Sequence, residues 1–207
     1  MDMNIQIEST EGINNMYNFD FARADSQFRW LKKKYGWHPL PYFMLGLSQW
    51  WRMVPDVTNT EFDEAFFAYM DSSLVASQNI FDKGSTVEGG FFLSATYAFI
   101  GRAHAERSNW TKAAAAGKNA LKYLDYCREK EEYGAEILFG DALYNYYSVW
   151  IPENYPLLKP IKIFFKNGDK ELGIKQLKEV ANNAFFTRTE AQYFLMRILA
   201  NEENNPM

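Results

Sequence analysis

The residues best placed to do chemistry lie together near the middle of the chain, at Arg102, His104 and Glu106. Arg102 and Glu106 are four positions apart, so on a helix they can form an ion pair across one turn. A general-acid role for His104 would need a partner carboxylate held in a cleft. The sequence offers no second histidine nearby, no serine motif and no metal-ligand spacing to complete such a site. We therefore predict a surface ion pair beside a half-buried histidine, and we do not expect an enzyme.

A second group, Trp50, Trp51 and Arg52, could hold a ligand by aromatic stacking or by cation–π contact. Consecutive residues of a helix point about 100° apart, so only one of the two tryptophans can face a groove squarely. We expect Trp50 to face a groove and Trp51 to pack in the core.

Six lysines and only two acidic residues lie between Lys159 and Lys178. This excess could attract an acidic peptide, phosphate groups or an anionic membrane surface. The simpler interpretation is that the lysines keep an otherwise apolar insert soluble. The whole chain has a net charge of -4, which gives no general reason to expect a nucleic-acid partner.

Cofactor and metal motifs are missing from the sequence. The one cysteine, Cys127, excludes an internal disulfide framework and a multi-cysteine metal site. Gly89-Gly90 lacks the lysine and hydroxyl of a phosphate-binding loop. We expect neither cofactor nor metal.

No apolar run approaches the roughly 20 residues of a membrane-spanning helix, and residues 1–12 do not form a signal peptide. The expected compartment is the cytoplasm if Met1 is the native start. It is the periplasm or the exterior if a signal peptide has been removed.

The stretch from Tyr97 to Ala120 positions the central residues, and it predicts two helices joined as a hairpin. Small residues are expected to let the two backbones approach closely, while bulky ones fill the space between the helices. The small residues are Gly101, Ala113, Gly117 and Ala120, and the bulky ones are Tyr97, Ile100 and Trp110.

The same helical periodicity runs through the rest of the chain, with no alternating segment of strand length. Residues 1–8 are expected to be loose, and the first helix to begin at Ser9-Thr10-Glu11. We predict one domain, 1–207, of four hairpins and a terminal helix. Its parts are the hairpins 9–35, 41–82, 87–130 and 134–183, an insert at 151–166 that contains a short apolar helix, and the terminal helix 189–200.

The terminal helix has apolar residues around its circumference, including Phe194, Met196, Ile198 and Leu199. Because ends of helical stacks normally present a polar outer face, we expect an uncovered patch here. Further helices beyond Met207, or a second copy in a homodimer, would cover it.

These patterns resemble the tetratricopeptide-repeat superfamily over nearly the whole chain. The first helices share a glycine, at Gly12, Gly46, Gly101 and Gly140. The second helices are expected to start at Asp20, Glu61, Asn109 and Asp169. The second helices start 41, 48 and 60 residues apart by subtraction, whereas the usual repeat is about 34 residues, so the repeats are degenerate. The runs MYNFDF, HPLPYF, WWR, GRAHAERSNW, LYNYY and GDKELG are further similar to a bacterial tetratricopeptide-like group. That group is itself similar to eukaryotic outer-membrane and inclusion-body-clearance proteins.

The resemblance implies an all-α, right-handed superhelix of four to five hairpins whose first helices line a concave surface. By position, that surface would expose Trp50, Arg102, Asp141, Tyr144 and Asn145. It implies a non-enzymatic scaffold that binds a peptide or protein partner. The alternative is a carrier of a small apolar molecule or lipid, with aromatic residues enclosing the pocket and the proline-rich insert as its lid.

Overall fold

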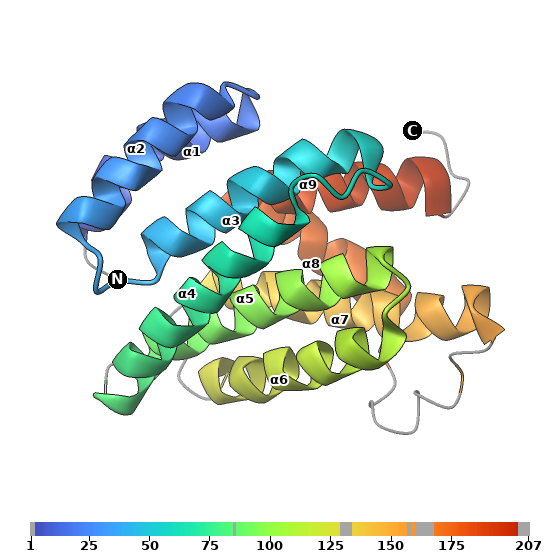
Figure 1. Ribbon diagram of the computed structural model, residues 1–207. Helices are drawn as coiled ribbons and strands as arrows, with labels where there is room; N and C mark the ends of the chain where they lie inside the picture. Colours follow the sequence, from blue (N-terminus) through green and yellow to red (C-terminus); the bar gives the residue numbers. More distant parts are fainter. Residues whose placement is uncertain (1–2, 85, 129–133, 157–158, 160–167, 203–207) are drawn as a thin grey trace. The chain divides into compact units, whose positions relative to one another are not determined.

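The computed structural model describes residues 3–84, 86–128, 134–156, 159 and 168–202, and all regular structure in these residues is helical (Figure 1). The predicted all-α class is therefore confirmed. The chain divides into two compact units, which we call the N-terminal unit, Met1–Lys130, and the C-terminal unit, Glu131–Met207. The single continuous domain expected from the sequence stays a prediction. The short apolar helix expected within 151–166 falls largely outside the described residues.

Six α-helices and one short 3₁₀ turn form the described part of the N-terminal unit. They are α1 (Met3–Tyr17), α2 (Phe21–Lys34), α3 (Leu40–Met53), η1 (Val54–Asp56), α4 (Asp63–Asp82), α5 (Thr86–Glu106) and α6 (Trp110–Arg128). Each helix packs on the next, which gives the hairpins α1–α2, α3–α4 and α5–α6. The first helices of neighbouring hairpins also touch, α1 with α3 and α3 with α5. The hairpins therefore form a row within this unit (Figure 1).

The first and third hairpins turn in the same way. In each, the second residue after the first helix has a positive φ, 62° at Phe19 and 56° at Ser108. The Phe19 amide donates to Met16 O and the Asp20 amide to Asn15 O, and equivalent bonds occur at Ser108 and Asn109. This is the Schellman arrangement, in which glycine is the usual left-handed residue. The strain of a side chain there is roughly 1–2 kcal/mol, and at Phe19 it is offset by edge contacts with the rings of Phe21 and Trp51.

Close approach at a first-helix glycine is also shared by the three hairpins. A Cβ atom added at Gly12 would lie 2.7 Å from the Phe28 ring, and one at Gly46 would lie 2.8 Å from Met70 Cε. At Gly101 the nearest atom would be the Ala113 carbonyl oxygen, at 3.3 Å. These partners all lie on the second helix of the same hairpin. The Gly117 amide nitrogen would lie 3.6 Å from the Cβ atom added at Gly101, so the backbones are close there, but an added Cβ atom at Gly117 itself would meet nothing within 4 Å.

The predictions for Trp50 and Trp110 are both wrong. Trp50 is only 2% exposed, against Phe66 and Phe99, so it is a core residue. Trp110, expected between the paired helices, is 36% exposed. It is the first residue of α6, and a helix end has solvent on one side. By contrast, α3 is packed on nearly every side, and only Tyr42 and Arg52 among its residues are not buried.

The N-terminal helix begins earlier than expected, at Met3, so the prediction that residues 1–8 are loose is wrong for residues 3–8, and residues 1 and 2 lie outside the described residues. The Ser9 and Thr10 hydroxyls do not cap a helix start. Both donate to the Gln6 carbonyl oxygen, at 2.9 Å, which lies one turn back within α1.

In the C-terminal unit, the described helices are α7 (Gly134–Asn154), α8 (Lys170–Asn183), α9 (Arg188–Arg197) and the π-helical turn η3 (Ile198–Glu202). As predicted, Asp169 caps α8, because its carboxylate accepts a hydrogen bond from the Leu172 amide at 3.0 Å. α7 runs to Asn154 and includes Pro152 in its last turn, so the break expected from Ile151 onward begins a few residues later. α8 packs on both α7 and α9.

The last helix is better covered than expected. Phe194 and Ile198 are buried in a core with Phe139, Tyr146 and Leu177. The prediction of an uncovered apolar patch on this helix is therefore wrong for these two residues, while Met196 is exposed. The homodimer inferred from that patch stays a prediction.

Glu136, in the first turn of α7, caps α9 from another helix. Its carboxylate accepts hydrogen bonds from the amides of Phe185, Phe186 and Thr187, at 2.6 to 3.0 Å, and from the Thr187 hydroxyl at 2.7 Å. These three amides lie in the turn just before α9, where no helix supplies an acceptor, so they need a side chain or water. Here a carboxylate about 50 residues earlier satisfies all three.

Candidate functional site

A narrow depression, too small to hold a water molecule, lies in the N-terminal unit where the loop after α3 meets the last turn of α5. The residues that line it come from α3, this loop and α5, and are Trp50, Met53, Val57, Ala103, Glu106 and Arg107. The loop itself comprises residues 54–62 and begins with the short turn η1.

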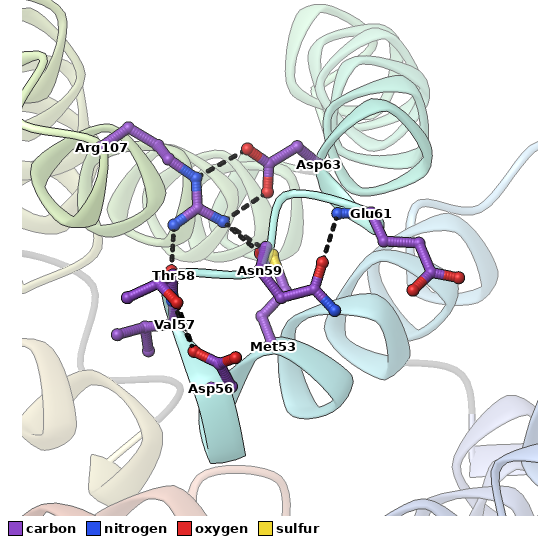
Figure 2. Close-up of polar contacts among 8 residues, drawn as sticks. All are labelled: Met53, Asp56, Val57, Thr58, Asn59, Glu61, Asp63 and Arg107. Carbon is purple, nitrogen blue, oxygen red and sulfur yellow. Dashed lines mark hydrogen bonds and ion pairs between the residues drawn. The ribbon is translucent and has the colours of Figure 1, made fainter.

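Arg107 holds this loop against the helices (Figure 2). Its guanidinium donates to both carboxylate oxygens of Asp63, at 2.7 and 2.6 Å, in a bidentate ion pair. It also donates to the carbonyl oxygens of Val57 and Asn59, the latter at 2.9 Å. Both charged side chains are mostly buried. The neighbouring carboxylate raises the pKa of Arg107 above its ordinary value, so the arginine stays charged throughout the accessible pH range.

Within the loop, side chains support the backbone. The Asp56 carboxylate accepts hydrogen bonds from the Thr58 hydroxyl at 2.6 Å and the Thr58 amide at 3.0 Å. The Asn59 side chain accepts one from the Glu61 amide at 2.9 Å (Figure 2). The Thr58 hydroxyl bond is the main reason that the pKa of Asp56 is lowered. These Asx-type turns hold the loop in one conformation.

Arg102 and Trp50, both predicted for the groove, are in direct contact. The Arg102 guanidinium carbon lies 4.4 Å from the centroid of a Trp50 ring. Arg102 is half-buried, whereas Trp50, predicted to face the groove, is buried and packs against the guanidinium from inside the unit. The Trp50 Nε1 atom is buried, and no residue described in the structure accepts a hydrogen bond from it.

His104 is half-buried, as predicted, and its ring stacks on Phe67 with centroids 4.9 Å apart. Burial, with a smaller effect from Lys112, lowers the pKa of His104. A neutral imidazole stacked on a phenyl ring stabilises the α4–α5 packing.

Sequence reasoning missed a buried charge network between α2 and α3. Asp25 accepts a hydrogen bond from the Ser48 hydroxyl at 2.6 Å and forms an ion pair with Arg52 at 3.1 Å. The Arg52 guanidinium also lies 4.6 Å from the centroid of the Phe21 ring. The available signal was Asp25 next to Ala24, on the apolar face of α2. Buried carboxylates are nearly always paired.

A second missed pair is His38 and Glu88. The His38 side chain is fully buried, and its Nδ1 accepts a hydrogen bond from the Leu40 amide at 3.1 Å. Nε2 therefore bears the proton and donates to the Glu88 carboxylate at 2.9 Å. Both ring nitrogens are engaged, which makes this pair a structural link between the α2–α3 turn and α5.

The other three predicted groove residues, Asp141, Tyr144 and Asn145, lie on α7 in the C-terminal unit, and all are half-buried. The Asn145 side-chain amide donates to Gln176 Oε1 at 2.8 Å, so it takes part in the packing of α7 on α8. The structure thus brings together two of the five predicted residues within one unit and three within the other.

Among the described residues there is no group of three histidine, cysteine or acidic side chains arranged to hold a metal ion. In the same part of the chain, none of the helices combines the length and the apolar character needed to cross a membrane.

Comparison with models of protein families, with curated proteins and with solved structures finds no significant match to this chain.

Proposed function

We propose that the protein is a non-enzymatic scaffold that binds a peptide or protein partner, built as a tetratricopeptide-like right-handed stack of hairpins. Three features of the N-terminal unit support this architecture: the row of hairpins, the contacts between first helices, and the turn shared by the first and third hairpins. Stacked helix hairpins present an extended surface formed by side chains of successive repeats.

The observation on which the proposal mainly depends is the contact of Arg102 with Trp50. The tryptophan is fixed by Phe66 and Phe99, and the guanidinium lies 4.4 Å from its ring. An arginine oriented in advance loses less conformational entropy when it binds a carboxylate. We therefore expect a partner segment that presents an acidic side chain or a terminal carboxylate to Arg102.

The burial of α3 and the position of Arg102 on α5 indicate where such a segment would lie. Nearly all of α3 is buried, so a partner would contact the half-buried residues of α5. These include His104 and Glu106, which lie between Ala103 and Arg107 at the end of α5. The arrangement favours an extended or helical segment running along α5.

The test is capture of partners from an extract of the source organism by the immobilised protein. Arg102→Glu reverses the charge at the proposed contact, and Lys118→Glu is the matched control because Lys118 is exposed on α6. We expect partners retained by the parent protein and the Lys118→Glu variant to be lost with Arg102→Glu, with unchanged circular dichroism in all three.

Two results would contradict the proposal. One is retention of the same partners by Arg102→Glu at undiminished yield. The other is native mass spectrometry that finds a small apolar molecule bound after purification, which would favour the carrier instead.

A further inference from the structure

The end of α2 and the turn that follows it form an exposed basic and aromatic surface. We call it the Trp30–Trp37 surface, and it consists of Arg29, Trp30, Lys32, Lys33, Lys34, Tyr35 and Trp37. Trp30 is 45% exposed and Trp37 is 59% exposed. Large apolar side chains seldom gather at an exposed site without a binding role.

The charge of this surface is opposite to that of the rest of the molecule. Residues 29–37 contain four basic side chains and no acidic one. Since the whole chain carries -4 and this segment carries +4, the remaining residues carry a formal net charge of -8. A cluster of cations creates a local positive potential that attracts negatively charged partners, even on a chain of negative net charge.

Two of the four cations have carboxylates nearby. Arg29 lies 3.7 Å from Asp25, which is shared with Arg52, and Lys34 lies 2.7 Å from Glu8. Lys32 extends over the Tyr42 ring, with its nitrogen 5.4 Å from the centroid, and Lys33 is exposed. Lysines in the last turn of a helix also stabilise its C-terminal end. That effect accounts for the lysines. Trp30 lies beneath Lys34, with its ring centroid 5.0 Å from the lysine nitrogen, and Trp37 contacts the His38 ring at 5.2 Å, yet about half of each tryptophan stays exposed.

We propose that the Trp30–Trp37 surface docks on an anionic lipid membrane. Tryptophan and tyrosine partition to the boundary between headgroups and acyl chains, and lysines are attracted to anionic headgroups. The surface is a helix end and a turn at the edge of the N-terminal unit (Figure 1), a form that suits a flat partner better than a peptide, which needs a groove. Attachment of this kind lies on the membrane and needs no spanning helix.

The test is flotation of the whole protein with phosphatidylcholine vesicles that either contain or lack phosphatidylserine. We expect binding only to the anionic vesicles at about 0.1 M salt and release at roughly 1 M salt, where the Debye length falls to about 3 Å. Each lysine near an anionic surface contributes about fivefold to the partition constant. Lys32→Gln/Lys33→Gln should therefore lower that constant by about 25-fold.

The control with the same change in charge is Lys112→Gln/Lys118→Gln, since both lysines are exposed on α6. It should reduce binding by no more than about twofold, because α6 lies outside the proposed surface. Trp37→Ala should weaken binding several-fold while Trp110→Ala does not. Circular dichroism checks that each variant is folded, because Trp37 contacts the His38 ring.

The proposal fails if the parent protein does not bind the anionic vesicles at low salt. It also fails if both lysine pairs reduce binding equally, since the attraction would then be a property of overall charge. Binding of soluble polyglutamate through Lys32 and Lys33, without vesicle binding, would overturn it in favour of an acidic peptide partner.

Discussion

Replacing Arg107 should increase the mobility of the loop after α3, residues 54–62, and lower the stability of the N-terminal unit. In Arg107→Ala, the Asp63 carboxylate loses a bidentate partner, and two loop carbonyls lose their donor. A hydrogen bond to a charged group contributes about 1.5–3 kcal/mol, but water can reach part of this site and the bonds are not independent. We therefore expect the N-terminal unit to lose roughly 2–4 kcal/mol of unfolding free energy.

Urea unfolding followed by tryptophan fluorescence measures this loss, because five of the six tryptophans lie in residues 1–130. The matched control is Arg23→Ala, whose ion pair with Asp20 at 3.4 Å is exposed and should contribute under about 1 kcal/mol. Hydrogen exchange should show faster exchange at the amides of Thr58 and Glu61 in Arg107→Ala only.

A double-mutant cycle with Asp63→Asn separates the ion pair from the carbonyl contacts. We expect a coupling energy of about 1–3 kcal/mol, since the two side chains touch directly. The reasoning is refuted if Arg107→Ala costs no more than Arg23→Ala, or if loop exchange is unchanged. Either result would mean that the Asx turns alone hold the loop.

Three further predictions concern the core, the helix cap and the cysteine. Trp50→Ala should lower the unfolding free energy by about 3–5 kcal/mol through lost burial and a cavity, and Trp110→Ala by under about 1.5 kcal/mol. Equal losses in urea unfolding would contradict the burial of Trp50. Glu136→Gln should lower the unfolding free energy by roughly 1–3 kcal/mol because three amides in the turn before α9 lose a charged acceptor. The same change at the exposed Glu171 should have little effect, and equal melting temperatures for the two variants would contradict the stabilising role of Glu136. Burial raises the pKa of the Cys127 thiol to about 11 from an ordinary 9.0, so the native thiol should resist aromatic disulfide reagents at neutral pH, and rapid labelling of the native protein would contradict its burial. Because the folded state favours the protonated thiol, its contribution to stability is complete below pH 9 and is lost as the pH rises toward 11.

The sequence was a good guide to local structure and a poor one to side-chain placement. Helical spacing of apolar residues predicted the hairpins, and turn residues such as Asp169 marked a helix start correctly. These signals arise within a few residues of the chain. The wrong predictions for Trp50 and Trp110 show what local patterns cannot tell. Both residues occupy apolar helical positions, and only the packing of neighbouring helices decides which side chain is buried.

The polar contacts were harder still to foresee. Arg107 meets Asp63 across 44 residues of sequence, and His38 meets Glu88 across 50. No local pattern specifies such a partner, since the pairing depends on where a loop or turn lies after the helices have packed. Arg102 was predicted as a groove residue from its position in the repeat, but the tryptophan beneath it became evident only from the contact between α3 and α5.

The cap that Glu136 provides for α9 has a consequence for the order in which the C-terminal unit folds. Each of its backbone bonds spans 49 to 51 residues, so the entropy of closing a long segment must be overcome before α9 gains its cap. Helical repeats usually grow by adding one neighbour to the next, with local contacts that form quickly. Here the beginning and the end of the unit are joined directly, so α7 must already be in place before α9 can be stable. The C-terminal unit should therefore gain its structure in one cooperative step, and a nascent chain should not acquire a protease-resistant C-terminal unit until the segment around Thr187 has left the ribosome.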